Sequence, residues 1–417
     1  MTKPRMDNDS LTAYNESQQA WMLNQKVKTM VKNGLSALVV CCAVLVTPSI
    51  SQADIWNGFE DLQPVSRLFE GDLQLTSTTK SYCDSCVDET CTSADCCTST
   101  ACGCYDSIVP NMIGTGGLNI PLRFGSLPVA IQSQFTRVSN NNSVIPQDRV
   151  AFGYGMIDAV DTRGNSGEAT ISEFNLILEK TFADGMISGT VILPWSHTTL
   201  SEVDGFGLTV SEGTEIGDIA LGLKALLIDG DNLSISAGAL LELPTSENLE
   251  VPPITTLIND AYYLTSFLGM LYNVNEDLYM QSFVSYRTQL GNNELTGMLA
   301  GFEVEHPELL MVDAAIGYWL YRGEGSGITG IVPTVELYYT NSDEGYTGTT
   351  EISSAIGGVD YLNLTTGVTA IMNNKSSIAL GLNVPLRKGF TSAAGGTNTD
   401  QNGEWSLMLQ YNHYLGR

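Results

Sequence analysis

The sequence predicts an all-β protein: a closed antiparallel transmembrane β-barrel of about 12–14 strands, preceded by an irregular Cys-rich segment. Three observations predict this fold. Apolar residues recur at every second position in one segment after another, which is typical of strands with unlike faces. These segments are long, and an export signal precedes them. The 41 glycines, 17 tyrosines and only 16% charged residues are typical neither of a disordered chain nor of a helical one.

The first element is a signal peptide, predicted over residues 1–53. Three lysines, Lys26, Lys28 and Lys32, precede an apolar stretch at 35–46. Small residues then lead to a cleavage site between Ala53 and Asp54. The pattern indicates export into a Gram-negative envelope.

The second element, residues 54–110, is acidic, rich in Ser and Thr, and without hydrophobic period. It holds seven cysteines: Cys83, Cys86, Cys91, Cys96, Cys97, Cys102 and Cys104. In an oxidising compartment so short a segment favours structural disulfides, and the odd number leaves one thiol free or paired between chains. The Cys83/Cys86 spacing also fits a zinc or other thiolate site, although no histidine lies nearby. All three interpretations stay open.

The third element, residues 111–417, is the predicted barrel. It contains fourteen candidate strands of about 9 to 14 residues, of which we expect one or two to be rim or plug segments. The stretch from Asp218 to Pro244 shows the pattern most clearly, with two alternating runs joined by a tight turn. Strands of this length suit a tilted bilayer crossing. After Ala53 no apolar run is long enough for a membrane helix, so a membrane location requires a closed barrel.

The alternation assigns two faces to each strand. If the apolar face meets lipid, seven charged residues project into the lumen: Glu173, Glu179, Asp218, Lys224, Glu242, Asp313 and Glu336. Their carboxylates then either favour passage of cations or only hydrate the interior and bond across it. Aromatic residues near strand ends are expected in interfacial girdles: Trp195, Tyr262, Tyr263, Tyr272, Trp319, Tyr321, Tyr338, Tyr339 and Trp405. A secreted soluble β protein, with the apolar face inward, is the alternative.

Several stretches carry a resemblance to known barrels. "NNNSVIPQDRVAFGYGMIDAV" (140–160), "VPTVELYYT" (332–340) and "EWSLMLQYNHYLGR" (404–417) resemble predicted outer-membrane proteins of planctomycete-type bacteria. "EIGDIALGLKALL" (215–227) followed by "LSISAGALLELPT" (233–245) is similar to the barrel family named after the meta-cleavage pathway of phenol degradation, whose members are called transporters. The resemblance implies an outer-membrane barrel that takes up small hydrophobic or aromatic compounds, and it carries over no catalytic residues.

The remaining features bound the function. A net charge of −27 argues against nucleic acid as a partner. The three histidines, His197, His306 and His413, form no recognisable catalytic motif, so we expect neither an enzyme nor a cofactor or metal.

The expected function is an outer-membrane pore or channel for small solutes. The alternative is a non-transporting envelope anchor or surface protein, cross-linked through its Cys-rich segment. The expected partners are outer-membrane lipid, an unknown small solute and the barrel assembly machinery, which would recognise the final strand.

Overall fold

The computed structural model describes residues 108–415 with gaps, and the account below concerns those residues. The gaps are 116–120, 125–126, 132–135, 162–167, 202–212, 252–254, 298–299, 301–302, 306–307, 324–325, 343–346, 349–359, 388–389, 392–396 and 399–404. The signal peptide and residues 54–107 of the Cys-rich segment, with all seven of its cysteines, therefore lie outside the described residues, as does His306. The last three residues of that predicted segment, 108–110, are described and lie inside the barrel.

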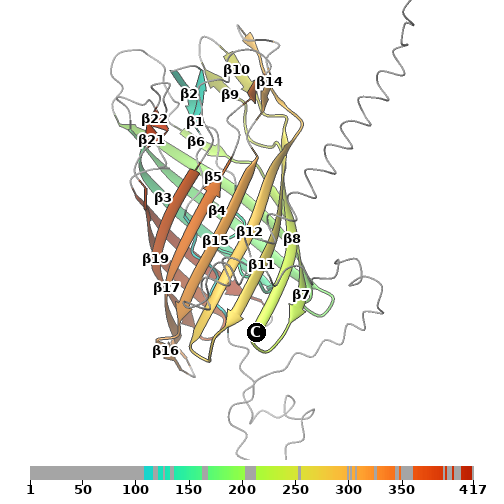
Figure 1. Cartoon of the computed structure of the whole chain (residues 1–417), viewed down its shortest axis with the longest axis vertical. Helices are drawn as coiled ribbons and strands as arrows, with labels where there is room; N and C mark the ends of the chain where they lie inside the picture. Colours follow the sequence, from blue (N-terminus) through green and yellow to red (C-terminus); the bar gives the residue numbers. More distant parts are fainter. Residues whose placement is uncertain are drawn as a thin grey trace, which may run out of the picture. The chain divides into compact units, whose positions relative to one another are not determined.

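The fold is a closed antiparallel β-barrel, as the sequence predicts (Figure 1). Its sheet has 14 strands, of which β6 (Gly213–Ile216) and β16 (Tyr321–Arg322) are short additions, leaving twelve long strands. Pairing of β15 with β17 closes the ring, so no long strand keeps a free edge. The long strands are β3 (Arg149–Asp161), β4 (Glu168–Phe182), β5 (Ile187–Ser201), β7 (Ala220–Asp229), β8 (Leu233–Glu242), β11 (Tyr262–Asn273), β12 (Leu278–Leu290), β15 (Leu309–Tyr318), β17 (Ile328–Asn341), β19 (Asp360–Met372), β20 (Ser376–Pro385) and β23 (Trp405–Tyr414).

Two of the fourteen candidate strands are not barrel strands. Part of the first forms β2 (Leu127–Ile131), which pairs only with β1 (Pro121–Phe124). The other contributes β14 (Glu303–Glu305) to a separate sheet of five short strands. The remaining strands of that sheet are β9 (Leu249–Val251), β10 (Thr255–Ile258), β13 (Asn293–Leu295) and β18 (Thr347–Gly348).

The two ends of the barrel differ. At one end the strands are joined by tight turns, such as the one where Asn373 and Asn374 adopt positive φ angles of 50° and 52°. Asn tolerates this left-handed conformation better than most residues, so it suits a two-residue hairpin turn. At the other end lie the short strands of the small sheets, including β9, β10 and β14 and the pair β21 (Phe390–Thr391) and β22 (Thr397–Asn398) (Figure 1). We call these the short-turn end and the long-loop end.

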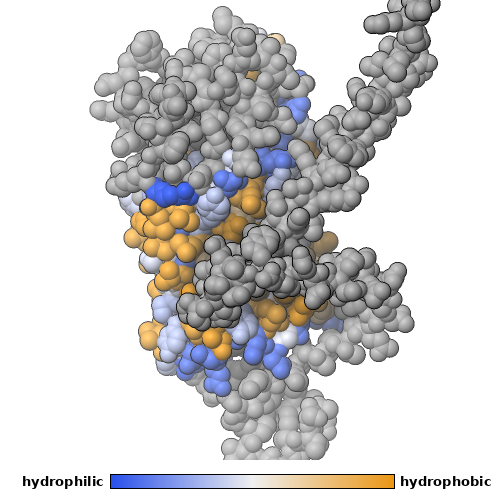
Figure 2. All heavy atoms as spheres, viewed as in Figure 1, coloured by the Kyte–Doolittle hydropathy of each residue, from blue (hydrophilic) through white to orange (hydrophobic). Residues whose placement is uncertain are grey.

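The outer face of the barrel is apolar. On β20, Ile378, Leu380 and Leu382 are 39–46% exposed, whereas the alternating Ser377 and Ala379 are buried. Figure 2 shows a hydrophobic band across the barrel wall with hydrophilic residues above and below it. So large a continuous apolar surface is unfavourable in water and favourable against hydrocarbon. Among the described residues no helix is long and apolar enough to cross a membrane.

The interior is filled by the chain that leads into the barrel. Two stretches, residues 108–115 and 136–147, lie inside without joining the sheet, and we call them the internal segment. Ile108 belongs to a buried cluster with Trp319, which lies at the short-turn end, and the Thr115 carbonyl accepts a bond from Ser406 at the long-loop end of β23. The second stretch returns from Thr136 to the short-turn end, where the Asp148 carbonyl accepts a bond from Leu415. The chain thus crosses the barrel twice before β3 begins.

The hydrophobic core sits inside the barrel, between the internal segment and the wall. It includes Met112, Val138 and Val144 of the internal segment. From the wall it includes Phe267, Phe283 and Tyr338. The described interior is thus not lined by polar residues alone, because the internal segment supplies apolar partners that periodicity on the strands could not reveal.

Three residues expected in the aromatic girdles are buried inside as well. These are Tyr263, Tyr338 and Trp319. Each of the two tyrosines has an adjacent tyrosine, Tyr262 or Tyr339, and neighbours along a strand must point to opposite faces.

Candidate functional site in the barrel interior

Four carboxylates on the barrel wall hold the internal segment in place. They belong to Asp313 on β15, Glu179 on β4, Glu242 on β8 and Glu336 on β17. All four are among the residues that alternation assigned to the inward face, and each is almost fully buried. Buried charges persist only when they are paired and hydrogen-bonded, so the partners of each define the site.

Asp313 binds the guanidinium of Arg137, which comes from the internal segment. The Arg137 Nε lies 3.0 Å from Oδ1 and 3.1 Å from Oδ2, and a terminal nitrogen of the same guanidinium also donates to Oδ1. Arg137 further donates to the Thr340 hydroxyl at 2.7 Å and to the Tyr339 carbonyl at 2.9 Å. Ser139 donates to the second Asp313 oxygen at 2.6 Å. This forked, charge-assisted contact fixes the middle of the internal segment to β15 and β17.

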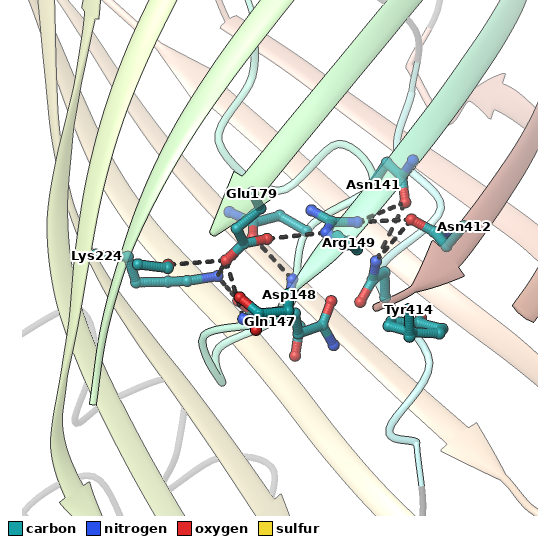
Figure 3. A network of polar contacts seen from close by, with 12 residues as sticks. Asn141, Gln147, Asp148, Arg149, Glu179, Lys224, Asn412 and Tyr414 are labelled. Carbon is teal, nitrogen blue, oxygen red and sulfur yellow. Dashed lines mark hydrogen bonds and ion pairs between the residues drawn. The ribbon is translucent and has the colours of Figure 1, made fainter. Parts of the chain in front are cut away.

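Glu179 is shared by two cations near the short-turn end (Figure 3). Its Oε2 accepts from Arg149 Nε at 2.8 Å, and its Oε1 lies 3.0 Å from Lys224 Nζ. Arg149 also donates to Asn412 at 2.7 Å and to Asn141 at 3.2 Å.

The internal segment adds its own contacts to this cluster. Lys224 donates to the Ser143 carbonyl at 2.8 Å and to Asn142 Oδ1 at 3.0 Å. The Gln147 amide donates to Glu179 Oε1 at 3.2 Å. Strands β3, β4, β7 and β23 thus hold the returning stretch through one network.

Glu242 and Glu336 bind backbone amides of the internal segment. Glu242 accepts from the Thr136 amide at 2.7 Å, while its other oxygen lies 2.9 Å from Arg287. Glu336 accepts from the Ile113 amide at 2.8 Å and the Gly114 amide at 3.1 Å. The carboxylates therefore satisfy amides that strand pairing leaves unpaired.

The two remaining predicted lumen residues have different surroundings. Glu173 on β4 is buried at the inner face and lines a small cavity. Asp218 precedes β7 and is only half-buried, and it accepts bonds from the amides of Thr245 and Ser246 near the long-loop end. It therefore belongs to the rim, because its strand begins two residues later.

The interior charges nearly cancel. Among the described residues, the buried acids are Glu173, Glu179, Glu242, Asp313 and Glu336, and the buried bases are Arg137, Arg149, Lys224 and Arg287. Five negative and four positive charges leave −1, although the whole chain carries −27. The formal charges of the described buried acids and bases therefore nearly balance.

The sequence-based inventory missed the three interior arginines. Arg149 and Arg287 lie an even number of residues from Gly153 and Ser285, so each points to the same inward face of its strand. The alternation of side chains along these strands could therefore have identified both arginines. Arg137 gives no such signal, because it lies in an irregular stretch and its acidic partner is 176 residues away in the chain.

Two small cavities remain beside the internal segment. One, of about 30 Å³, lies against β3, β4, β5 and β23. The other, of about 40 Å³, lies against β4, β5, β7 and β8. Asn140, Asn141, Ile177 and Ile192 line both. Both cavities therefore lie along the same flank of the internal segment.

The described residues offer little for catalysis. His197 and His413 are exposed and bond to Thr214 and Ser376 at 3.1 and 2.9 Å. Among the residues that the structure describes, no group of His, Cys, Asp or Glu side chains is placed to hold a metal ion.

Fold and interior together define the class of protein: an outer-membrane β-barrel whose interior is filled by its own N-terminal chain. Closure, all-antiparallel pairing and the apolar outer belt place it in the membrane with its wall strands crossing the bilayer.

Comparisons with known proteins find similar barrels at low identity. The KdgM porin in complex with disordered oligogalacturonate is 9% identical, with 64% of this chain and 99% of that chain covered and a TM-score of 0.35. The β-domain of the Bordetella autotransporter BrkA is 11% identical, with 65% and 100% covered and a TM-score of 0.41. The Ralstonia pickettii toluene transporter TbuX is 12% identical, with 64% and 90% covered and a TM-score of 0.31. No family model matches the sequence, and no curated protein matches it.

Proposed function

We propose that the protein is a gated outer-membrane channel for small solutes, in which the internal segment is the gate. One observation carries the proposal: the segment is held by side chains of the wall and takes no part in the sheet. It can therefore shift without breaking any strand pairing. Two cavities lie along its flank, and they give the segment space into which it can shift.

The class of solute is the finer part of this proposal. The resemblance to the phenol-degradation barrels supports small hydrophobic or aromatic compounds, and it rests on the quoted stretches alone. We also propose that the barrel assembly machinery recognises β23. This last strand of the barrel pairs with β20 and with the first long strand, β3.

The experiment is conductance of the full mature chain in planar bilayers, compared with the variant Arg137→Met. The substitution keeps an unbranched apolar stem but removes the guanidinium that binds Asp313. We expect brief, rare openings in the wild type and at least about fivefold more open time in the variant, because breaking a buried ion pair costs about 3–5 kcal/mol.

Lys180→Met is the matched control. Lys180 also forms an ion pair, with Asp148 at 2.9 Å, but its side chain is 65% exposed on the outside of β4. An exposed pair contributes about 0–1 kcal/mol, so open time should stay at the wild-type value. Folding of every variant is checked by heat-dependent electrophoretic migration.

The packed interior supports a second candidate, a non-transporting envelope anchor. In that function the Cys-rich segment, whose cysteines lie outside the described residues, cross-links the barrel to a neighbour. Folded wild type and Arg137→Met that both fail to conduct, together with dimers that disappear on reduction, would contradict the channel and establish the anchor.

A further inference from the structure

We propose that the cavity between the internal segment and strands β3, β4 and β23 binds a small uncharged solute that carries hydroxyl groups. The proposal goes beyond the hydrophobic or aromatic solutes that the resemblance supports, because it adds a second solute class with its own site, and its physiological meaning rests on the channel function. Binding itself can be measured whether or not the barrel conducts.

Glycines at inward positions of β3 create the space. A Cβ added at Gly153 would meet only the Cβ of Asn175, at 3.8 Å. At Gly381 on β20, by contrast, an added Cβ would lie 2.7 Å from the Ile113 side chain of the internal segment. The internal segment therefore packs closely against Gly381 of β20, whereas Gly153 of β3 faces a cavity.

Two buried amide side chains that line this cavity each have one polar atom without a partner among the described residues. Asn141 accepts bonds through Oδ1 from Asn111 and Arg149, both at 3.2 Å, and its Nδ2 has no partner among the described residues. Gln410 donates through Nε2 to the Ile113 carbonyl, and its Oε1 has no partner among them either. Both side chains are 97% or more buried, at 3% and 2% exposure, and both line the cavity.

These atoms specify the chemistry of an occupant. A buried polar atom without a partner costs about 1–3 kcal/mol, so a ligand that pairs with both atoms recovers that free energy. Asn141 offers a donor and Gln410 an acceptor, and hydroxyl groups can both accept and donate hydrogen bonds.

The charge and the walls narrow the class further. The Glu173 carboxylate lines the cavity and disfavours an anion, while the nearby Arg149 is already bound to Glu179 at 2.8 Å. Ile192 and Pro194 supply apolar surface for a carbon skeleton. The cavity, of about 30 Å³, is small, which suits a short flexible polyol better than a rigid aromatic ring.

The test uses saturation-transfer NMR on the full mature chain in detergent micelles, with glycerol as the probe. The wild type should transfer saturation to glycerol. Gly153→Leu fills the cavity and should reduce the transfer at least about fivefold. Gly189→Leu is the matched control, because it adds the same side chain beside Phe182 on the outer face of β5 and should leave the transfer unchanged.

A second variant keeps the proposal testable if Gly153→Leu does not fold. Asn141 has a positive φ of 48°, which Asp also tolerates, and Asn141→Asp keeps the oxygen that Asn111 and Arg149 use. It replaces the unpartnered amide donor by a carboxylate oxygen whose charge lies next to the Arg149 guanidinium, so glycerol transfer should fall while the heat-dependent migration of the folded barrel persists.

Three results would overturn the inference. Absence of transfer in the wild type would mean that the cavity holds water alone. Equal transfer in the wild type and Gly153→Leu would mean that glycerol binds elsewhere. Stronger cavity-dependent transfer to methylammonium or toluene than to glycerol would contradict the solute class. A wild-type protein that binds glycerol but never conducts would contradict the proposed channel function and leave the binding site intact.

Discussion

Each basic side chain buried in the described interior lies against a carboxylate. Arg137 pairs with Asp313, Arg287 with Glu242, and both Arg149 and Lys224 with Glu179. A cation removed from water needs such a partner, since the desolvation cost of an isolated buried charge is several kcal/mol. The pairing explains how the described interior can contain five acidic and four basic side chains whose formal charges nearly cancel.

The shared carboxylate predicts an asymmetry between substitutions. Glu179→Gln leaves two buried cations facing a neutral group, and we expect it to lower the free energy of unfolding by about 3–5 kcal/mol. Lys224→Met leaves Glu179 bound to Arg149, Ser188 and the Gln147 amide, so the loss should be only about 1–3 kcal/mol. Urea unfolding in a fluid bilayer measures both.

The double variant provides the control for that comparison. Glu179→Gln with Lys224→Met removes the carboxylate and one of its two cations together, so its loss should be smaller than the sum of the single losses. Losses that add within about 0.5 kcal/mol would contradict direct coupling between the two side chains.

At the scale of the elements, the strands were predictable and the internal segment was not. The alternation in β4, β7 and β23 is visible in the sequence because side-chain direction repeats every two residues. The stretch "NNNSVIPQD" before β3 has no period, and it reads as an ordinary polar connection. Its location inside the barrel depends on partners far away in the chain, such as Lys224 and Gln281, which lie 82 and 139 residues from Asn142, and local patterns do not report such contacts.

The outer belt makes a prediction that depends on depth. Leu380 lies in the middle of β20 and is 46% exposed on the outside, while Leu386 lies just beyond the strand's end and is 47% exposed. Leu380→Arg should destabilise the barrel by about 2–4 kcal/mol, because the charge meets the bilayer midplane. Leu386→Arg should cost about 0–1 kcal/mol. Urea titrations in liposomes that gave equal losses would contradict lipid contact along this face.

At the scale of the whole molecule, sequence reasoning predicted the class of fold and the orientation of most wall residues, but not the state of the lumen. Alternation with apolar neighbours predicted that four carboxylates point inward: those of Glu179, Glu242, Asp313 and Glu336. Their role in binding the internal segment could not follow from it, because an inward carboxylate can equally face water. The cysteines of the Cys-rich segment lie outside the described residues, so their disulfide and metal interpretations stay predictions.

Hydrogen–deuterium exchange of the internal segment in the folded, full mature chain tests most directly whether the barrel is filled by its own chain. The amides of Ile113, Gly114, Thr136 and Gln147 donate to Glu336, Glu242 or Glu179. They should exchange at least about a hundredfold more slowly than an unstructured chain, and Glu336→Gln should speed the exchange of Ile113 and Gly114 only. Exchange of all four amides at the unstructured rate, while amides of β11 and β12 stay protected, would contradict the account.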